Sequence, residues 1–545
     1  MVHSTLASLL QAFEWEIERE MVEDVREKVG ITLQKKRSLV GIPKPRLPDF
    51  LLILGYLPYL SDRLHEDLHK LAGTYGPIFS LRLGQKPAII VSSPDVAKEI
   101  LKHKDLSFSS RTITEAMRCM AYDGTSLVFV PYGGRWRLLR RILTTELFSS
   151  RAIDLFLPAR KQQVHGLLID LYSASQNKTP VNLAESTFIA SANLVSNLIC
   201  SKNLFDKNKK EGRELKEMAR EALEVVGEPN IADLIPVLKV FDPQGLKRRL
   251  MKTAKKFDEF FDKLIDERLE ERRKGVKIND NGRMDMLDVF LDYRSQKKDD
   301  ELKEFSRVDI KGMLADMFIA GTDTTSSTVE WGMTEILKNS AIHTKLTTEL
   351  DRVVGRHRFV EESDIPNLPY LQSTVKELFR VHPAVLLLIP RRNDQDCHIS
   401  GFHIPKHTIL LVNVWGMGRD LNLWADPMEF RPERFEGSDI DVKGQDFELL
   451  PFGAGRRVCV GMPLGHRMVH STLASLLQAF EWEIEREMVE DVREKVGITL
   501  QKKRSLVGIP KPRLPDFVYK MEYHKDDIPC GTPDSSKQFL LLVKT

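Results

Sequence analysis

The sequence predicts one large, mainly α-helical domain with small β-sheets, and three observations lead to this fold class. Residues from about 135 to 380 carry mostly helical patterns of apolar and charged side chains. Short strand-like runs precede this stretch and return near 396–413 and 480–510. No Pro-, Gly- or Ser-rich linker interrupts residues 51–517. We therefore expect a single domain there, although a length of 545 residues at about 150 per domain would favour three or four.

The first part of this domain predicts a helix, a hairpin and a second helix, in that order. A helical pattern over 65–76 ends at a glycine. Strand-like runs at 78–83 and 88–93 are separated by the turn residues 84–87, which is hairpin spacing. Ser93-Pro94 then supplies an N-cap and a first-turn proline for the next helix.

Composition and charge exclude several classes of protein. Hydrophobic residues make up 42% and charged residues 29% of the chain, which is ordinary globular composition and excludes a disordered or fibrous protein. A net charge of +3 is too small to indicate a nucleic-acid partner. The five cysteines are too scattered for a disulfide framework. They are Cys119, Cys200, Cys397, Cys459 and Cys530.

An internal duplication dominates the organisation of the chain. Residues 1–50 repeat residues 468–517 without a single change. Solenoids need at least about three units, and their units drift apart in sequence. Identity without drift favours a recent gene fusion or an error in joining exons over a functional repeat. We predict three parts, namely the duplicate 1–50, a functional domain 51–517 and a C-terminal extension 518–545 of unknown role.

The apolar stretches near the N-terminus are too short to cross a membrane, because a spanning helix needs about 20 apolar residues. The run Leu6–Phe13 contains Gln11 and is followed by acidic residues, and the run 50–60 contains Gly55 and Pro58. No basic segment precedes an apolar one, as a signal peptide would require. We expect no transmembrane anchor in this chain.

The strongest chemical signal is the glycine-rich loop Phe452–Gly461 (FGAGRRVCVG), which a predicted helix follows directly. Its glycines let the backbone turn tightly and approach a flat ligand. Cys459 lies just ahead of the helix start, where free N–H groups favour a thiolate, and Arg457 can meet an anionic group. A soft, negatively charged sulfur suits an iron ligand. The pattern F-x-x-G-x-R-x-C-x-G argues against the alternative of a merely structural cysteine.

A second signal, the segment Ala320–Thr325 (AGTDTT), lies inside a predicted helix from about Val308 to Lys338. Its Ala and Gly leave room for a bulky neighbour, and its Thr hydroxyls can bend the helix by bonding to the previous turn. An acid next to an alcohol, as at Asp323 and Thr324, can pass protons. Taken alone, the segment fits a helix kink or ordinary helix packing equally well.

Two further motifs place charged side chains on helix faces. Glu377 and Arg380 share one face, and Arg434 follows some fifty residues later; a carboxylate buried between two arginines would lock a core. Trp136 and Arg140 also share a face and suit a flat anionic group, although a solvated arginine on an amphipathic helix is the alternative.

Together these motifs resemble the cytochrome P450 family of haem-thiolate monooxygenases, over residues 60–517. The resemblance implies the cytochrome P450 fold and haem b. The implied haem contacts are Cys459 as the axial iron ligand, Phe452 beside its sulfur, Arg457, Trp136 and Arg140 at the propionates, and Arg391 as a weaker propionate candidate. Asp323 and Thr324 match the pair that delivers protons to bound dioxygen, whereas Glu377, Arg380 and Arg434 match a structural triad.

The sequence around the motifs is similar to that of plant enzymes that hydroxylate monoterpenoids or act on benzylisoquinoline alkaloids. This implies oxidation of a small hydrophobic substrate, faced by residues in 111–130, by Ala320, and by Leu386 and Leu387 within 384–389. Oxidative phenol coupling or rearrangement at the same haem, and a non-catalytic haem-binding fusion product, remain as alternatives.

The resemblance also implies the partners and the location. Dioxygen is the co-substrate, and NADPH-cytochrome P450 reductase delivers electrons to a basic face that carries Arg137, Arg141, Arg456 and Arg467. Family members sit on the cytosolic face of the endoplasmic reticulum membrane, so we expect membrane association; we expect no nucleic acid.

Overall fold

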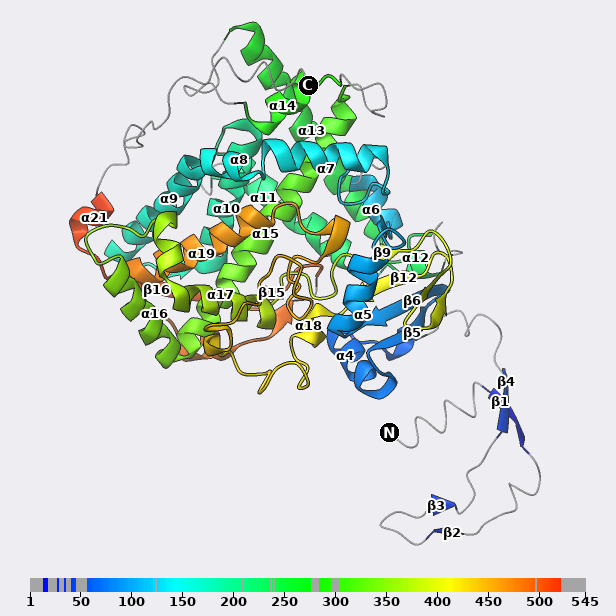
Figure 1. Ribbon diagram of the computed structural model, residues 1–545. Coiled ribbons are helices and arrows are strands. Elements are labelled where there is room, and N and C mark those ends of the chain that lie inside the picture. The colour runs from blue at the N-terminus through cyan, green and yellow to red at the C-terminus, as the bar shows by residue number, and fades with distance from the viewer. Residues whose placement is uncertain are drawn as a thin grey trace.

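A helical body with small sheets makes up the computed structural model (Figure 1). The structure describes residues 56–120, 122, 125–206, 210–228, 230–235, 238, 241–275, 284–295, 304–495 and 497–520, together with four short strands within residues 13–45. Its helices are α4 Leu64–Tyr75, α5 Pro94–Lys98, α6 Glu115–Met120, α7 Gly134–Glu146, α8 Ser150–Leu155, α9 Leu157–Gln176, α10 Leu183–Cys200, α11 Lys210–Gly227, α12 Ile231–Leu234, α13 Leu246–Arg273, α14 Met286–Asp292, α15 Arg307–Lys338, α16 Ser340–Val353, α17 Pro369–Val381, α18 Val414–Met417, α19 Met462–Ala479, α20 Arg486–Glu490 and α21 Asp516–Lys520.

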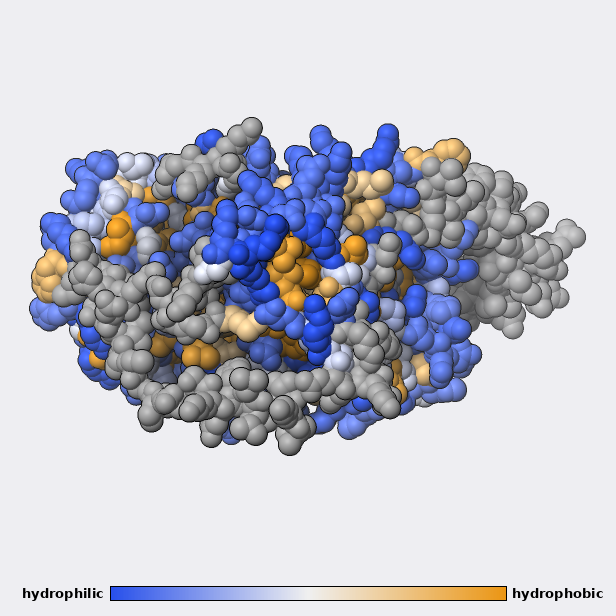
Figure 2. All heavy atoms as spheres, turned by 90° about the horizontal axis from the view of Figure 1, so that it is seen from above, coloured by the Kyte–Doolittle hydropathy of each residue, from blue (hydrophilic) through white to orange (hydrophobic). Residues whose placement is uncertain are grey.

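The long helix α15 is the axis of the body. It begins at a capping box, in which the Ser306 hydroxyl accepts from the Asp309 N–H and the Asp309 carboxylate accepts from the Ser306 N–H. Helices α10 and α19 pack along it, and α9 packs on both of them. Helix α13 covers it further out, and Figure 2, seen from the side of α13 and α14, shows a largely hydrophilic face.

A five-stranded sheet stands beside the helices and brings distant residues together. Its order is β5 (Ile78–Leu83), β6 (Lys86–Val91), β12 (Ile409–Val412), β9 (Arg391–Arg392) and β7 (Ser110–Arg111). Strands β6 and β12 run parallel, and the other neighbours are antiparallel. The register places Arg111 opposite Arg391. The hydroxyl of the next residue, Thr112, donates to the Arg391 carbonyl oxygen, 279 positions away in the sequence. The predicted hairpin is confirmed, with its second strand starting two residues early.

Local signals set several element ends as predicted. Helix α4 ends at Gly76, whose φ of 95° suits a residue without a side chain. The Ser93 hydroxyl accepts a hydrogen bond from the Val96 N–H, and Pro94 takes the first helical position of α5. Of the described cysteines, Cys200, Cys397 and Cys459 are free. Among the described helices only α10 is long and apolar enough to cross a membrane, and 72% of that stretch is buried inside the protein.

The two copies of the duplicated segment form the same strand pairs. In the C-terminal copy β13 (Phe480–Glu483) pairs with β16 (Val507–Pro512), and β14 (Glu494–Lys495) pairs with β15 (Gln501–Lys502). In the N-terminal copy β1 (Phe13–Ile17) pairs with β4 (Gly41–Pro45), and β2 (Glu27–Lys28) pairs with β3 (Gln34–Lys35), in the same registers. Among the described strands of the two copies, only β16 of the C-terminal copy pairs with a strand outside the duplicated segment, β8 (Val181–Asn182).

The folded body extends beyond the predicted boundary at residue 517. Val518 and Tyr519 are buried, and the ring of Tyr519 stacks on that of Tyr172 with centroids 4.4 Å apart. The boundary therefore lies at Lys520 or later, and residues 521–545 lie outside the described residues.

We predict that residues 1–50 contribute nothing to the stability of the body. The C-terminal copy is tethered to the body through the Cys459 loop and fills the place between α9 and α15, so a close-packed core has no room for a second copy. A protein made of residues 51–545 should keep the melting temperature and haem content of the full chain. A large fall in both would show that the first copy is part of the fold.

Candidate functional site

A cavity of about 310 Å³ lies between the middle of α15, helix α7, residues 384–389 and the loop at Cys459. Most side chains of its wall are aliphatic or aromatic, which suits a flat or small apolar molecule. The wall includes Leu127, Trp136, Leu143, Leu194, Val195, Ala320, Thr324, Val385, Leu388, Phe452 and Cys459.

The cysteine loop is shaped by its glycines. Gly453 and Gly455 both adopt a φ of 69°, and a Cβ at Gly455 would lie 2.1 Å from the Leu101 carbonyl oxygen. The Cys459 N–H donates to the Phe452 carbonyl oxygen at 3.0 Å, which closes the loop just before α19 begins at Met462. Phe452 itself packs edge-on against Phe379, with ring centroids 5.2 Å apart.

Cys459 lies deep in the protein, but its side chain is open to the cavity. Burial raises the pKa of its thiol, and the N–H groups of Gly461 and Met462 and the charge of Arg140 oppose the rise only in part. The N–H groups at the helix start thus favour the thiolate, as expected, but burial outweighs them. A bound metal ion supplies the positive charge that deprotonates such a thiol.

Four guanidinium groups converge on one wall of the cavity. Arg140 donates to the Val458 carbonyl oxygen at 2.6 Å. Arg391 donates to Asp105 at 3.0 Å and to the Ala454 carbonyl oxygen at 2.7 Å. Arg457 donates to four backbone carbonyl oxygens within residues 109–130. Its guanidinium carbon lies 5.1 Å from the ring centroid of Trp136. The fourth, Arg111, donates to the Ile389 carbonyl oxygen.

These charges are incompletely compensated within the protein. Burial lowers the pKa of all four groups, that of Arg457 to about 10, and the charges of Arg391 and Arg457 lower that of Arg111 further. Among the described residues, Asp105 is the one carboxylate hydrogen-bonded to any of the four. The buried Nε of Arg111 has no partner there. A cofactor with two carboxylates and a thiolate-binding metal fits this wall, and haem b meets both requirements.

Arg111 and Asp105 are site residues that the sequence interpretation missed. Arg111 belongs to a two-residue strand and reaches the cavity only because β7 pairs with β9. Asp105 accepts from Arg391 and from the backbone and side chain of Arg456, and so joins the sheet to the cysteine loop. Neither position carries a periodic or motif signal, because its partners lie about three hundred residues away.

Seven residues of helix α15 line the cavity, and Asp316, Ala320 and Thr324 among them are spaced four apart on one face; the others are Met317, Gly321, Thr325 and Thr328. The Thr324 hydroxyl donates to the Ala320 carbonyl oxygen at 2.9 Å, within its own helix. Asp323, one position earlier, is turned away from the cavity, and its carboxylate accepts hydrogen bonds from Thr499 and Gln501. The structure thus brings only the alcohol of the predicted acid–alcohol pair to the cavity wall.

Asp316 is a second carboxylate of the site that the sequence interpretation missed. It accepts from the Ser126 hydroxyl at 2.6 Å and from the Val128 N–H at 3.2 Å, and so fastens α15 to the loop before α7. Burial raises its pKa to about 6, although these hydrogen bonds oppose the rise. Its place one turn before Ala320 could have been read from the helical period.

The structure corrects two predicted substrate contacts. Leu386 and Leu387 lie outside the cavity and pack into two separate apolar clusters of the body. They occupy a turn that the Leu388 N–H closes onto the Val385 carbonyl oxygen at 3.3 Å, and Leu388 has a φ of 51°. Because of this turn, Val385 and Leu388 face the cavity in their place. Ala320 lines the cavity, and its contact with substrate stays a prediction.

A buried triad joins α17 to the segment 418–434, because Arg380 also donates to backbone carbonyls of that segment. Glu377 receives two hydrogen bonds of 2.7 Å from Arg380 and one of 3.2 Å from Arg434, and the side chains of Glu377 and Arg380 are fully buried. The Arg431 N–H adds a further bond to Glu377 at 2.8 Å. The three residues therefore meet as expected, and none of them lines the cavity.

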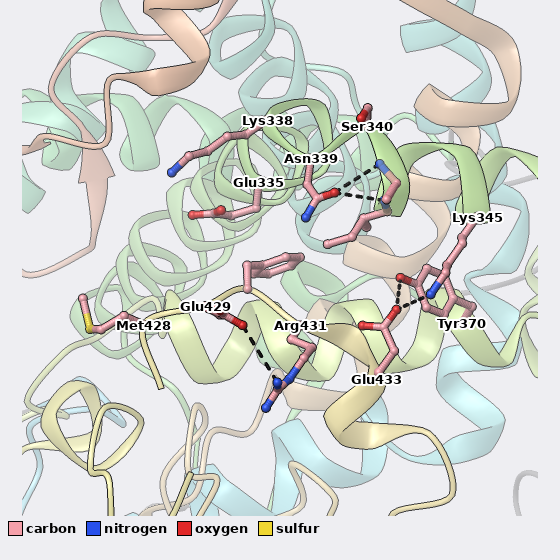
Figure 3. A pocket seen from close by; sticks show the side chains of 13 residues that line it. Glu335, Lys338, Asn339, Ser340, Lys345, Tyr370, Met428, Glu429, Arg431 and Glu433 are labelled. Atoms are coloured by element: carbon pink, nitrogen blue, oxygen red, sulfur yellow. Dashed lines mark hydrogen bonds and ion pairs between the residues drawn. The ribbon is translucent and has the colours of Figure 1, made fainter. Parts of the chain in front are cut away.

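Figure 3 shows a second hollow, lined by the end of α15, by α16, by Tyr370 of α17 and by residues 428–433; its volume is about 650 Å³. There Glu433, from the 3-10 turn Pro432–Phe435, accepts from Tyr370 at 2.8 Å and pairs with Lys345. Successive residues of one turn thus bond in opposite directions, Arg434 inward to the triad and Glu433 outward to α16 and α17.

Comparisons with known proteins agree on one family. The family model described as cytochrome P450 matches residues 45–509. The chain is similar to an iridoid oxidase of Catharanthus roseus (40% identity, covering 89% of this chain and 95% of the relative) and to a geraniol 8-hydroxylase of the same plant (42% identity, 86% and 93%). A zebrafish cytochrome P450 solved with progesterone has a TM-score of 0.69 at 25% identity, covering 82% of this chain and 99% of that one.

We predict that Glu377→Ala destabilises the body by about 3–5 kcal/mol, because it leaves the buried guanidinium of Arg380 without its carboxylate. The measurement is the free energy of unfolding in urea. Glu433→Gln is the matched control, because it removes the carboxylate next to Arg434, whose own partner Lys345 is exposed. Its effect on the free energy of unfolding should be much smaller. Equal effects of the two changes would contradict a special role for the buried triad.

Proposed function

Because the chain belongs to the cytochrome P450 family of haem-dependent monooxygenases, we propose that it hydroxylates a small hydrophobic plant metabolite, with a monoterpenoid as the first choice. The observation that carries the proposal is the apolar cavity with the Cys459 side chain open to it on one side and the Ala320–Thr324 face of α15 on its wall. The relatives named as geraniol 8-hydroxylase and iridoid oxidase support the substrate class.

The residues that would hold the haem are those of the arginine wall and the cysteine loop. Cys459 would ligate the iron, and Arg111, Arg140, Arg391 and Arg457 supply the donors and the positive charge for the carboxylates. Trp136 and Phe452 add aromatic wall on the same side as these groups. Bound in this way, haem supplies the activation of dioxygen, and the protein supplies position and charge.

The overall reaction consumes one substrate, one dioxygen, two electrons and two protons. One oxygen atom enters a C–H bond of the substrate and becomes its hydroxyl group, while the other leaves as water. The protein must therefore admit two protons to an otherwise apolar cavity. Thr324 is one of three threonines that α15 places at this wall, its hydroxyl bonds to the Ala320 carbonyl oxygen, and Asp323 is the acid next to it in sequence. We assign proton supply to this pair.

The electrons come from a redox partner, as the family requires, and NADPH-cytochrome P450 reductase is the partner that we propose. Arg137 and Arg456 are exposed on the side of the cysteine loop, and both lie over the ring of Tyr132 at 5.8 and 5.5 Å. Arg141 and Arg467 extend this basic face, which would attract an acidic flavoprotein surface. Such a partner places the enzyme at the cytosolic face of the endoplasmic reticulum membrane.

The test of function is turnover with the reductase, NADPH and geraniol, followed by mass spectrometry. We expect a product that is one oxygen atom heavier, and a red-shifted absorption band of the reduced, CO-bound protein. Cys459→Ser should lose both, because a hydroxyl does not replace a thiolate ligand. A thiolate band that survives this substitution would refute the assignment of Cys459. A coupled or rearranged product without added oxygen would refute the hydroxylase reaction while leaving the haem site intact.

We predict that Thr324→Ala keeps the haem but diverts electrons to hydrogen peroxide. Without this hydroxyl, the cavity loses the proton donor that we assign on α15, so dioxygen takes up two electrons and two protons and leaves as peroxide. The measurements are product and peroxide formed per NADPH consumed, with the CO-bound band as the control for haem content. Thr324→Ser, which keeps the hydroxyl, should stay close to the unchanged protein. Coupling that survives Thr324→Ala would count against the role.

A further inference from the structure

The carboxylate of Asp323 is held by the hairpin β14–β15, and we propose that Thr499 and Gln501 are positioning residues for proton transfer by this acid. The proposal rests on the proton-supply role assigned above to Asp323 and Thr324. Thr499 Oγ1 and Gln501 Nε2 both donate to Asp323 Oδ2, each at 2.7 Å. No described residue has a hydrogen bond to the other oxygen, Oδ1, in this structure.

The sequence Thr499-Leu500-Gln501 explains why both donors reach one oxygen. Thr499 lies in the bend before β15 and Gln501 is the first residue of that strand, and both side chains reach α15. Leu500 points the other way and is 1% exposed within an apolar cluster of the body. We call the two donors, Thr499 and Gln501, the clamp on Asp323.

The backbone of Leu500 fixes this clamp in place. Its N–H donates to the Ala384 carbonyl oxygen at 2.9 Å, and its carbonyl oxygen accepts from Trp331 Nε1 at 3.1 Å and from the Ser327 hydroxyl. Ala384 lines the cavity, and Trp331 is stacked on His382 with ring centroids 4.2 Å apart. The three residues 499–501 therefore join the acid, two further turns of α15 and the cavity wall into one rigid unit.

The clamp assigns different roles to the two carboxylate oxygens. Hydrogen bonds to a charged acceptor are stronger than neutral ones, so two donors on Oδ2 keep that oxygen an acceptor and fix the plane of the group. A proton that passes through this acid then uses Oδ1. It leaves when the Oδ1–H bond breaks toward the Thr324 side, and a proton from water restores the acid, so no other atoms or electrons are transferred. The Gln501 Nε2 group can only donate, whereas the Thr499 hydroxyl can donate and accept.

The experiment uses the full-length holoenzyme with its reductase and compares four variants: Thr499→Val, Thr499→Ser, Gln501→Leu and Asp323→Asn. For Thr499→Val and Gln501→Leu we expect product per NADPH to fall by at least about twofold and the solvent deuterium isotope effect on turnover to rise. The substrate-induced spectral shift and the CO-bound band should stay unchanged. Thr499→Ser keeps the hydroxyl and should behave like the unchanged protein.

A matched control separates positioning from mere packing. Thr347 is buried on α16, and its hydroxyl bonds within its own helix, so Thr347→Val removes an equivalent group far from the acid. Loss of haem content or substrate affinity in Thr499→Val but not in Thr347→Val would reduce the clamp to a structural contact and overturn the proposal. Melting temperatures give a second readout, since Thr499→Val should cost less in an Asp323→Ala background than in the unchanged protein.

The outcomes also separate this proposal from the proposed function. If Asp323→Asn changes coupling and the isotope effect while Thr499→Val and Gln501→Leu change neither, the positioning role is wrong and the proton role of the acid stands. If Asp323→Asn changes neither quantity in a protein that still hydroxylates its substrate, the proton role of the acid is wrong, and the clamp fails with it.

Discussion

Buried positive charge around one cavity is the constraint on which the rest of the structure depends. Four guanidinium groups have been taken out of water at one wall, and burial has lowered the pKa of each. Such groups are tolerated only where oxygen atoms surround them. The protein supplies backbone carbonyls from the loop before α7, from residue 389 and from the cysteine loop itself. The charges thus hold these three segments together, and the carboxylates of haem would complete the neutralisation.

Features that depend on neighbours along the chain could be predicted from the sequence. The Ser93 cap, the glycine end of α4 and the cysteine loop are set by residues within a few positions of one another. The fold class followed from the same local patterns, because helices and hairpins are short-range structures. The family motifs added pairings over longer range, such as Glu377 with Arg434, but only where a motif marks both partners.

What the sequence could not show depends on contacts between distant segments. Arg111 became a site residue through a two-residue strand that pairs across the sheet. The direction of Leu386 and Leu387 depends on a single turn, closed by the hydrogen bond from the Leu388 N–H to the Val385 carbonyl oxygen. Because of this turn, Val385 and Leu388 line the cavity instead. Asp323 and Thr324 were predicted as a pair because they are adjacent. Adjacent helical residues diverge by about 100°, so the helix itself separates them.

The duplicated segment shows the same difference between local and distant determinants within one chain. Both copies form the β13–β16 and β14–β15 pairings or their equivalents, because the strand registers are encoded in the segment itself. The pairing with β8 and the clamp of residues 499–501 on Asp323 belong to the C-terminal copy. That copy follows the Cys459 loop without a break, so one continuous stretch forms the helix behind the sulfur and then the hairpin that holds the acid of α15. An identical segment placed elsewhere in the chain reproduces the hairpin but lacks the cysteine loop. The covalent continuity between loop and hairpin is therefore what gives the segment its place in the site.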